Sequence, residues 1–223
     1  MSRVLVLRPQ PGADETAARS RALGLQPVLA PLFTIRPIAW SLPEEPFDAL
    51  LLTSANGARH GLRPELASLR CYAVGETTAA AAAQAGATDL VVGASDGAAI
   101  VERMAQDGVR RALHLCGREH LALAHPRVDL HRRAVYAADA ADRLPPEAAD
   151  ALANGALVLL HSPRAAALFA SLAPGRANIH IAAISAAAAE AAGSGWAAVH
   201  VAPRPRDEAL LELAVRLCNN GSN

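Results

Sequence analysis

Lysine is absent from the 223-residue sequence, so all 21 basic residues are arginines. Schiff-base aldolases and pyridoxal enzymes use a lysine amine as a nucleophile, and Walker-type phosphate loops use one as a phosphate clamp. The sequence therefore excludes these three kinds of mechanism.

An excess of positive charge is missing as well, because 21 acidic residues balance the basic ones. Proteins that bind nucleic acids or membrane surfaces depend on basic patches for much of their affinity. With 52% hydrophobic and 19% charged residues, the sequence predicts a protein with a sizeable core and no nucleic-acid or membrane partner.

Cysteine is scarce, and Cys71, Cys116 and Cys218 form no C-x-x-C pair. Such spacing fits a reducing cytosol better than a disulfide scaffold. The N-terminal stretch MSRVLVLRPQ has an apolar core of only four residues, which is too short for a signal peptide or a membrane span. We therefore expect a cytoplasmic protein.

Short apolar runs recur along the chain and alternate with alanine-rich segments of helical period. Such runs, separated by helices, predict parallel sheets that are covered on both faces, because both sides of each strand are then buried. The expected strands are residues 4–7, 49–53, 71–74, 89–92, 112–116, 156–160, 179–184 and 198–202. The fold class is therefore α/β.

Two long segments resemble each other at an offset of about 110 residues, which indicates an internal repeat. YAVGETTAAAAAQAGATDLVVGASDGAAIVERM aligns with IAAISAAAAEAAGSGWAAVHVAPRPRDEALLEL, so that Val74 falls against Ile184 and Ile100 against Leu210. Chance similarity between alanine-rich helices is the alternative explanation. The repeat predicts two similar domains with a ligand cleft between them, at the carboxyl ends of the parallel strands.

Small hydroxyl and amide side chains follow several of the expected strands: Thr53, Ser54 and Asn56 in LLTSANGA, Thr78 in VGETTA and Ser162 in LLHSPRA. The hydroxyls directly precede expected helices, where a side-chain oxygen can cap the helix by accepting from a free backbone N–H. Helix N-termini also suit carboxylates and phosphates, because their amides and dipoles favour negative charge. Capping and anion binding are compatible, and both remain open.

The stretch GASDG, residues 93–97, matches G-x-S-x-G between a strand and a helix, as a nucleophile elbow requires. The equivalent stretch of the second copy, PRPRD, is typical of an ordinary loop. Ser95 and Asp96 are also good caps for a helix that begins at Gly97. A serine hydrolase that uses Ser95 is therefore a minor alternative.

Histidines and a cysteine gather in HLCGREHLALAHPRVDLH, namely His114, Cys116, His120, His125 and His131. Their spacing matches no zinc pattern, and no G-x-G-x-x-G dinucleotide fingerprint is present. We expect neither a metal nor a cofactor.

Two larger side chains have open roles. Tyr136, one of two tyrosines, lies in HRRAVYAAD between the two halves, and it is either a proton donor or an aromatic lid on a domain edge. Arg8, at the end of the first expected strand, is either an anion clamp or a salt-bridge partner.

Taken in order, these motifs resemble the uroporphyrinogen-III synthase family over nearly the whole chain. They are VLVLRP with Pro31 downstream, LLTSANGA, YAVGETTAAAAAQAG, LHLCGRE, the VY of Val135 and Tyr136, and AAI…A…G…VAPRPRDEALLEL. The resemblance implies two parallel-sheet α/β domains joined by a two-stranded connector. Residues 1–35 and 141–223 would form one domain, 41–132 the other, and 36–40 and 133–140 the connector strands.

The resemblance also implies a reaction in heme biosynthesis. Hydroxymethylbilane, a linear tetrapyrrole with acetate and propionate side chains, is cyclised to uroporphyrinogen III with inversion of its terminal ring. The terminal hydroxyl leaves as water, and attack at a substituted pyrrole carbon gives a spiro intermediate that rearranges. The unguided substrate closes to the wrong isomer, so a monomeric enzyme without a cofactor must chiefly hold one conformation.

The resemblance implies that Tyr136 assists departure of the hydroxyl. It also implies that Ser54, Gly75, Thr78 and Ser162 contact the substrate carboxylates. The further candidates for substrate binding are Arg8, Thr53, Asn56, Gly117 and Ser185. The family usually shows Gly-Pro and then Thr where this chain has Ser185 to Ala188, and His161 stands where Thr is common. These departures favour an alternative, a non-catalytic module that binds a tetrapyrrole or another carboxylated ligand.

Overall fold

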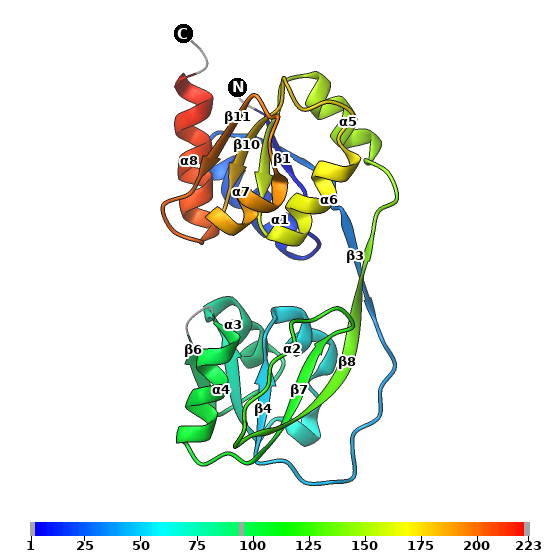
Figure 1. Ribbon diagram of the computed structural model, residues 1–223, viewed down its shortest axis with the longest axis vertical. Helices are drawn as coiled ribbons and strands as arrows, with labels where there is room; N and C mark the ends of the chain where they lie inside the picture. The colour runs from blue at the N-terminus through cyan, green and yellow to red at the C-terminus, as the bar shows by residue number, and fades with distance from the viewer. Residues whose placement is uncertain (1–2, 94–95, 221–223) are drawn as a thin grey trace. The chain divides into compact units, whose positions relative to one another are not determined.

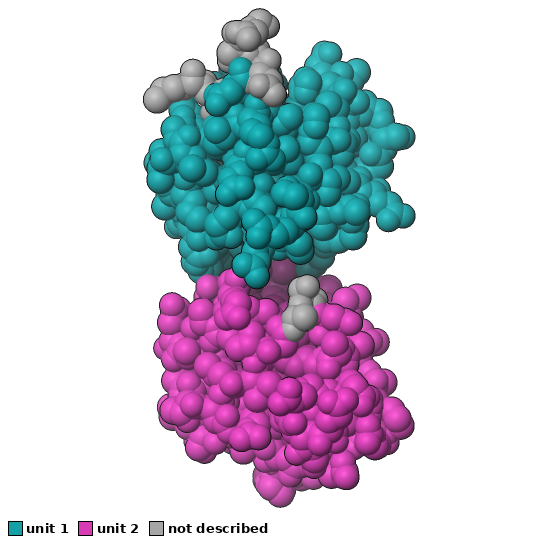
Figure 2. Space-filling view, turned by 90° about the vertical axis from the view of Figure 1, so that its left-hand side faces the viewer, with its two compact units in different colours: residues 1–34, 139–223 teal, residues 35–138 magenta. Residues whose placement is uncertain are grey.

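The computed structural model describes residues 3–93 and 96–220, and the chain divides into two compact units (Figure 2). Unit 1 consists of Met1–Thr34 and Asp139–Asn223, and unit 2 consists of Ile35–Ala138. Unit 1 is therefore discontinuous in sequence. The stretch 36–40, expected as a connector strand, belongs to unit 2 in this division, as does most of 133–140.

The sheet of unit 2 has six strands in the order β3-β8-β7-β4-β5-β6 (Figure 1). Neighbouring strands from β8 to β6 are parallel. The elements are β3 (Phe33–Pro37), β4 (Ala49–Leu52), α2 (Ala55–Gly61), a 3-10 helix (Pro64–Leu66), β5 (Arg70–Val74), α3 (Glu76–Gln84), β6 (Leu90–Gly93), α4 (Gly97–Gln106), β7 (Arg111–Gly117) and β8 (Asp129–Ala140).

Both faces of this sheet are buried, as the continuous apolar runs predict. Leu50 and Leu52 of β4 pack in one cluster with residues of α2 and α3. Leu51, which points to the opposite face, packs in a second cluster with Met104 of α4. The alternation of side chains along β4 therefore supplies both cores of unit 2.

The sheet of unit 1 has five parallel strands in the order β11-β10-β9-β1-β2. Its core on one face joins strand residues such as Val6 and Leu159 to Leu210 of α8. The elements are β1 (Arg3–Val6), α1 (Gly12–Ala22), β2 (Gln26–Leu29), α5 (Pro146–Ala153), β9 (Leu157–Leu160), α6 (Pro163–Leu172), β10 (His180–Ala183), α7 (Ala186–Ala192), β11 (Ala198–Val201) and α8 (Asp207–Asn220).

The two sheets share one topology, which confirms the internal repeat. The order β11-β10-β9-β1-β2 of unit 1 matches β6-β5-β4-β7-β8 of unit 2 strand for strand. In each unit the strand order reverses at one place, between β9 and β1 in unit 1 and between β4 and β7 in unit 2. Open parallel sheets bind ligands beyond the carboxyl ends of the strands at such a switch point.

Strands β3 and β8 carry the chain from one unit to the other and are neighbours in the sheet. The backbone N–H of Ile38 donates to the Val135 carbonyl at 2.9 Å, and that of Ala141 donates to the Leu32 carbonyl at 2.9 Å. As residue numbers rise along one strand they fall along the other, so the two run antiparallel. Two antiparallel strands therefore lie where the chain passes between the units, and the expected bounds 36–40 and 133–140 stay a prediction.

The eight predicted apolar strands are all present, within one or two residues of the expected ends. Strand β2 was not predicted, because Pro27 interrupts its short apolar stretch. The expectation that Thr78 directly precedes a helix is wrong, since α3 begins at Glu76 after Gly75, whose positive φ of 77° suits glycine. Within the described residues, no helix is long and apolar enough to span a membrane.

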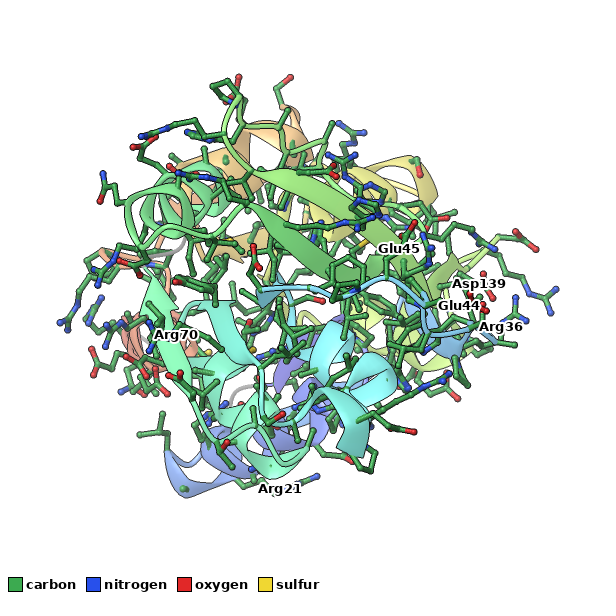
Figure 3. The ribbon with its side chains drawn as sticks, turned by 90° about the horizontal axis from the view of Figure 1, so that it is seen from below. Arg21, Arg36, Glu44, Glu45, Arg70 and Asp139 are labelled. Atoms are coloured by element: carbon green, nitrogen blue, oxygen red, sulfur yellow. The ribbon has the colours of Figure 1, made fainter. Side chains whose placement is uncertain are left out.

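Charged side chains of both signs lie at the margins of unit 2. Figure 3 shows Arg36 and Glu44 at one margin and Arg70 at the opposite one. Arg70 Nε lies 2.8 Å from an oxygen of Asp89, and Arg111 Nη2 lies 2.8 Å from an oxygen of Glu45. These pairs neutralise charge locally, in keeping with the balanced composition.

Candidate functional site

The switch point of unit 2 brings together residues that follow β4 and residues at the end of β7. Thr53 and Ser54 come directly after β4, and Gly117 is the last residue of β7. Tyr136 of β8 is the register partner of Gly117 across the next strand pair. Four of the candidate residues therefore lie at one end of the sheet.

Ser54 and Tyr136 form a direct hydroxyl pair, with 3.0 Å between Oγ and Oη. Ser54 Oγ also accepts from the backbone N–H of Gly57 at 3.1 Å, so Ser54 is the N-cap of α2. The capping prediction for Ser54 is confirmed. The phenol is half-buried and packs against the cluster that contains Val135.

Gly117 leaves the space that the ring of Tyr136 occupies. A Cβ atom at residue 117 would lie 2.8 Å from Tyr136 Cζ and 3.0 Å from Oη, closer than real side chains approach. The His60 ring lies 6.1 Å from that of Tyr136, centroid to centroid. Burial lowers the pKa of His60, and the nearby charge of Arg59 adds to this effect. The imidazole beside the phenol is therefore biased toward its neutral form.

The hydroxyl of Thr53 forms a hydrogen bond with a histidine of the neighbouring strand, with 3.0 Å between its Oγ1 and Nε2 of His114 on β7. His114 is 0% exposed, and burial lowers its pKa to about 4, with smaller contributions from His120 and Arg132. Its Nδ1 is buried with no hydrogen-bond partner within the described part of the chain. A neutral imidazole thus fixes the Thr53 hydroxyl.

Asn56 and Gly57 lie in the first turn of α2. The side-chain oxygen of Asn56 accepts from Arg59 Nη1 at 3.4 Å. A Cβ at Gly57 would approach the Leu115 carbonyl oxygen to 2.4 Å, so only glycine lets this turn lie against β7. The close approach holds the N–H of Gly57 where it can bind Ser54.

The remaining two candidates of unit 2 offer less to a ligand. The N–H of Gly75 already donates to the Gly93 carbonyl at 3.1 Å, and Thr78 is only 5% exposed. The neighbouring Thr77, in contrast, is exposed at the start of α3.

In unit 1, Ser162 and Ser185 occupy helix N-caps after β9 and β10. Ser162 Oγ accepts from the Ala165 N–H at 3.1 Å, and Ser185 Oγ accepts from the Ala188 N–H at 3.3 Å. The cap at Ser162 confirms the capping prediction there. Capping uses an oxygen lone pair, so it leaves each hydroxyl hydrogen for another acceptor. Ala188 is fully buried, so a hydroxyl-bearing side chain at this position would point into the core.

Arg8 is held at the switch point of unit 1 by a largely buried carboxylate. Its Nη1 donates to Thr16 Oγ1 at 3.1 Å and lies 3.7 Å from Asp207 Oδ1. Thr16 Oγ1 donates onward to the same Asp207 oxygen at 2.9 Å. Arg19 Nε donates to the other carboxylate oxygen at 2.8 Å. Gly12 makes room for the Arg8 guanidinium, since a Cβ there would lie 2.6 Å from its Nε.

His161 completes this network, with Nε2 2.8 Å from Asp207 Oδ1. Burial opposes the charge of Asp207, but the hydrogen bonds from His161, Thr16 and Arg19 outweigh it and lower the pKa to about 2. Burial also lowers the pKa of His161, against the opposing effect of Asp207. An ionised carboxylate only accepts, so Nε2 of the neutral imidazole carries the proton.

The alternative chemistries gain no support. Ser95 lies outside the described residues, while Asp96 caps α4 by accepting from the Ala98 N–H at 2.9 Å. His125 and His131 pair with Glu102 and Asp129 at 2.8 and 2.7 Å. Across residues 3–93 and 96–220, no group of three or more His, Cys, Asp or Glu side chains could hold a metal ion.

Sequence reasoning missed His114 and Asp207. The place of His114 in an apolar strand, ALHLC, indicates burial, but nothing in the sequence shows that its Nε2 meets Thr53. Asp207 stands at the start of a helix, where carboxylates are common, so the sequence carries no signal for its contacts with residues about 190 positions away in the chain.

The chain is similar to known proteins over most of its length. The family model for uroporphyrinogen-III synthase HemD matches residues 14–212. Uroporphyrinogen-III synthetase from Helicobacter pylori 26695 has a similar structure, with a TM-score of 0.68 and 20% identity over 97% of this chain and 99% of that one. A mutant uroporphyrinogen III synthase from the extremely thermophilic bacterium Thermus thermophilus has a TM-score of 0.56 and 18% identity, over 100% of both chains. No curated protein matches the sequence.

Proposed function

The chain belongs to the uroporphyrinogen-III synthase family, and on this premise we propose that it cyclises hydroxymethylbilane to uroporphyrinogen III with loss of water. The observation that carries the proposal is the family match over residues 14–212. The two-unit α/β fold, shared with solved structures of synthases, supports it.

The candidate residues suit a substrate with many carboxylates. Ser162 and Ser185 keep a hydroxyl hydrogen after capping their helices, and Thr53 and Asn56 are partly exposed beyond β4. Arg8 adds a positive charge beyond β1. Weak donors in several places bind a flexible polycarboxylate in one conformation, which is the main task when the unguided reaction gives another isomer.

Tyr136 is the proposed proton donor to the departing hydroxyl. A general acid must reach the leaving group and keep a fixed orientation. Packing on Gly117 and the bond to Ser54 supply that orientation. The proton from Tyr136 and the leaving hydroxyl form the water that is lost, and the proton that the substrate releases on ring closure restores the phenol.

The remaining candidates contribute to the site through the course of their backbone and not through a side-chain contact with the substrate. Gly117 supports Tyr136, whereas Gly75 and Thr78 shape the start of α3 and offer little direct contact.

An isomer assay tests the proposed function. The protein is mixed with freshly generated hydroxymethylbilane, and the oxidised products are resolved by chromatography. We expect the type III isomer in excess over the type I isomer of the uncatalysed reaction. Product that is only type I, together with tight binding of the tetrapyrrole, would instead support the non-catalytic module, which the exposed Ala186 and Ala187 favour.

The proposal extends to a monomer in the cytoplasm that acts on a small molecule and not on nucleic acid. Free Cys71 and Cys116, both buried, support a reducing compartment. Light scattering coupled to gel filtration tests the monomer.

A further inference from the structure

The contacts of Ser54 limit what its hydroxyl can do. A serine hydroxyl has one hydrogen and two lone pairs. One lone pair accepts from the Gly57 N–H at 3.1 Å, and the Oγ faces Tyr136 Oη at 3.0 Å. If Ser54 donates to Tyr136, it has no hydrogen left for a substrate carboxylate.

Proton transfer from Tyr136 decides the direction of this bond. When the phenol donates its hydrogen to a leaving hydroxyl, only the lone pairs of Oη remain for Ser54, so Ser54 must be the donor. As the proton leaves, negative charge grows on Oη, and the bond from Ser54 becomes charge-assisted and stronger. An interaction that strengthens toward the transition state raises kcat rather than lowering KM.

The surroundings keep Ser54 in place for this donation. The Gly57 N–H that binds its oxygen is fixed by the close packing of Gly57 on the Leu115 carbonyl. The ring of Tyr136 lies directly against Gly117. Both ends of the Ser54–Tyr136 bond are therefore anchored by backbone contacts that only glycine permits.

We propose that Ser54 is a positioning residue that donates its hydroxyl hydrogen to Tyr136 Oη and stabilises the phenolate formed as Tyr136 protonates the leaving hydroxyl. This inference rests on the proposed function and changes the role of Ser54 from holding a substrate carboxylate to supporting the acid. The proton passes from Tyr136 to the hydroxyl, which departs as water, while Ser54 keeps its own proton.

The test compares Ser54→Ala, Ser54→Thr and Ser54→Asp with the parent in steady-state kinetics on hydroxymethylbilane. Ser54→Ala removes the donor, and we expect kcat to fall about tenfold while KM changes less than about twofold. Ser54→Thr keeps the hydroxyl and should restore kcat to within about threefold of the parent. Ser54→Asp still caps α2 but cannot donate, so kcat should fall at least as far as in the alanine variant.

Asp96→Ala is the matched control for the lost cap. It removes the cap of α4 in the same unit without touching Tyr136, so it should lower stability and leave kcat unchanged. An equal loss of kcat in Asp96→Ala would overturn the proposal, since general destabilisation would then explain both variants.

A spectroscopic readout reports the bond without turnover. The chain has two tyrosines, so a protein labelled with carbon-13 at tyrosine Cζ gives two NMR signals, and Tyr136→Phe assigns them. Ser54→Ala should shift the Tyr136 signal and leave the Tyr72 signal in place, while Asp96→Ala should shift neither.

The outcomes separate this inference from the proposed function. A rise in KM at constant kcat, or an unmoved Tyr136 signal, overturns the role of Ser54 and leaves the synthase activity standing. A parent protein that forms no type III isomer overturns the proposed function itself, whatever the NMR signals show.

Discussion

The position of the Tyr136 ring depends on Gly117, against which the ring lies. A methyl group at position 117 would sit 2.8 Å from Tyr136 Cζ, so Gly117→Ala must displace the ring. We expect kcat to fall at least about tenfold, because small misplacements of a reacting group are costly, with a stability loss of about 1 to 3 kcal/mol from overpacking. Steady-state kinetics and thermal denaturation measure the two effects.

Gly175→Ala is the control for that change. A Cβ at residue 175 meets nothing within 4 Å, so this variant should behave as the parent does. If Gly117→Ala also keeps the parental kcat, the ring is not held by this contact.

The phenolic oxygen of Tyr136 can be removed without changing the ring. Tyr136→Phe should lower kcat roughly 10 to 100 fold, the range of lost acid assistance, while folding is nearly untouched. Tyr72→Phe removes the other phenolic oxygen, which binds Asp107, and should leave kcat as it was. A parental rate in folded Tyr136→Phe would restrict Tyr136 to packing.

Buried His114 makes stability depend on pH. The pKa of His114 is about 4 in the folded protein, whereas a solvated imidazole in the unfolded chain has a pKa of 6.5. Between these two pH values the unfolded state binds a proton that the folded state does not. The contribution of His114 to stability should therefore be constant above about pH 6.5 and should fall by about 3 kcal/mol as the pH drops to 4.

Denaturant titrations at several pH values check this expectation. His114→Asn should flatten the acid side of the stability profile, because it removes the buried imidazole. An unchanged slope in His114→Asn would show that other groups carry the acid sensitivity.

At the scale of single elements, a serine that caps a helix stabilises that helix and, in the proposed site, also contacts the ligand. Ser162→Ala should destabilise the protein by about 0.5 to 2 kcal/mol through loss of the α6 cap. Ser162→Asp should keep the cap but weaken binding of uroporphyrinogen III, because it brings negative charge toward the product carboxylates. Melting curves and calorimetric titrations separate the two effects.

Ser171, near the other end of α6, provides the control. Its hydroxyl donates to the Leu168 carbonyl and caps nothing, so Ser171→Ala should change neither quantity by much. Parental product affinity in a folded Ser162→Asp variant would leave Ser162 with a capping role alone.

At the scale of the whole molecule, each unit has its own core. Unit 2 is continuous in sequence and has buried clusters on both faces of its sheet, so residues 35–138 should fold cooperatively as a fragment. Circular dichroism and denaturant unfolding of the fragment check this. A fragment that lacks a cooperative transition would show that unit 2 needs the rest of the chain.

Unit 1 should also fold after its two segments are joined by a short glycine-rich linker in place of residues 35–138. The bond between the Ala141 N–H and the Leu32 carbonyl shows that the two cut ends lie close together. The same measurements apply to this deletion variant.

The sequence by itself determined the local features of this protein. The apolar runs fixed parallel strands with two buried faces, and the repeat fixed two similar halves. The caps at Ser54 and Ser162 follow from residues three positions apart, whose geometry is set as soon as the helix begins.

Only the tertiary structure decided the contacts of the candidate site. Ser54 meets Tyr136 across 82 positions, Thr53 meets His114 across 61, and Thr16 meets Asp207 across 191. These pairs depend on strand order and register, through which the switch point places β7 beside β4 and β1 beside β9. Hydrophobic patterning tells which face of a strand is buried, but it carries no information on which strand lies next to it, so such partners emerge only when the sheet assembles.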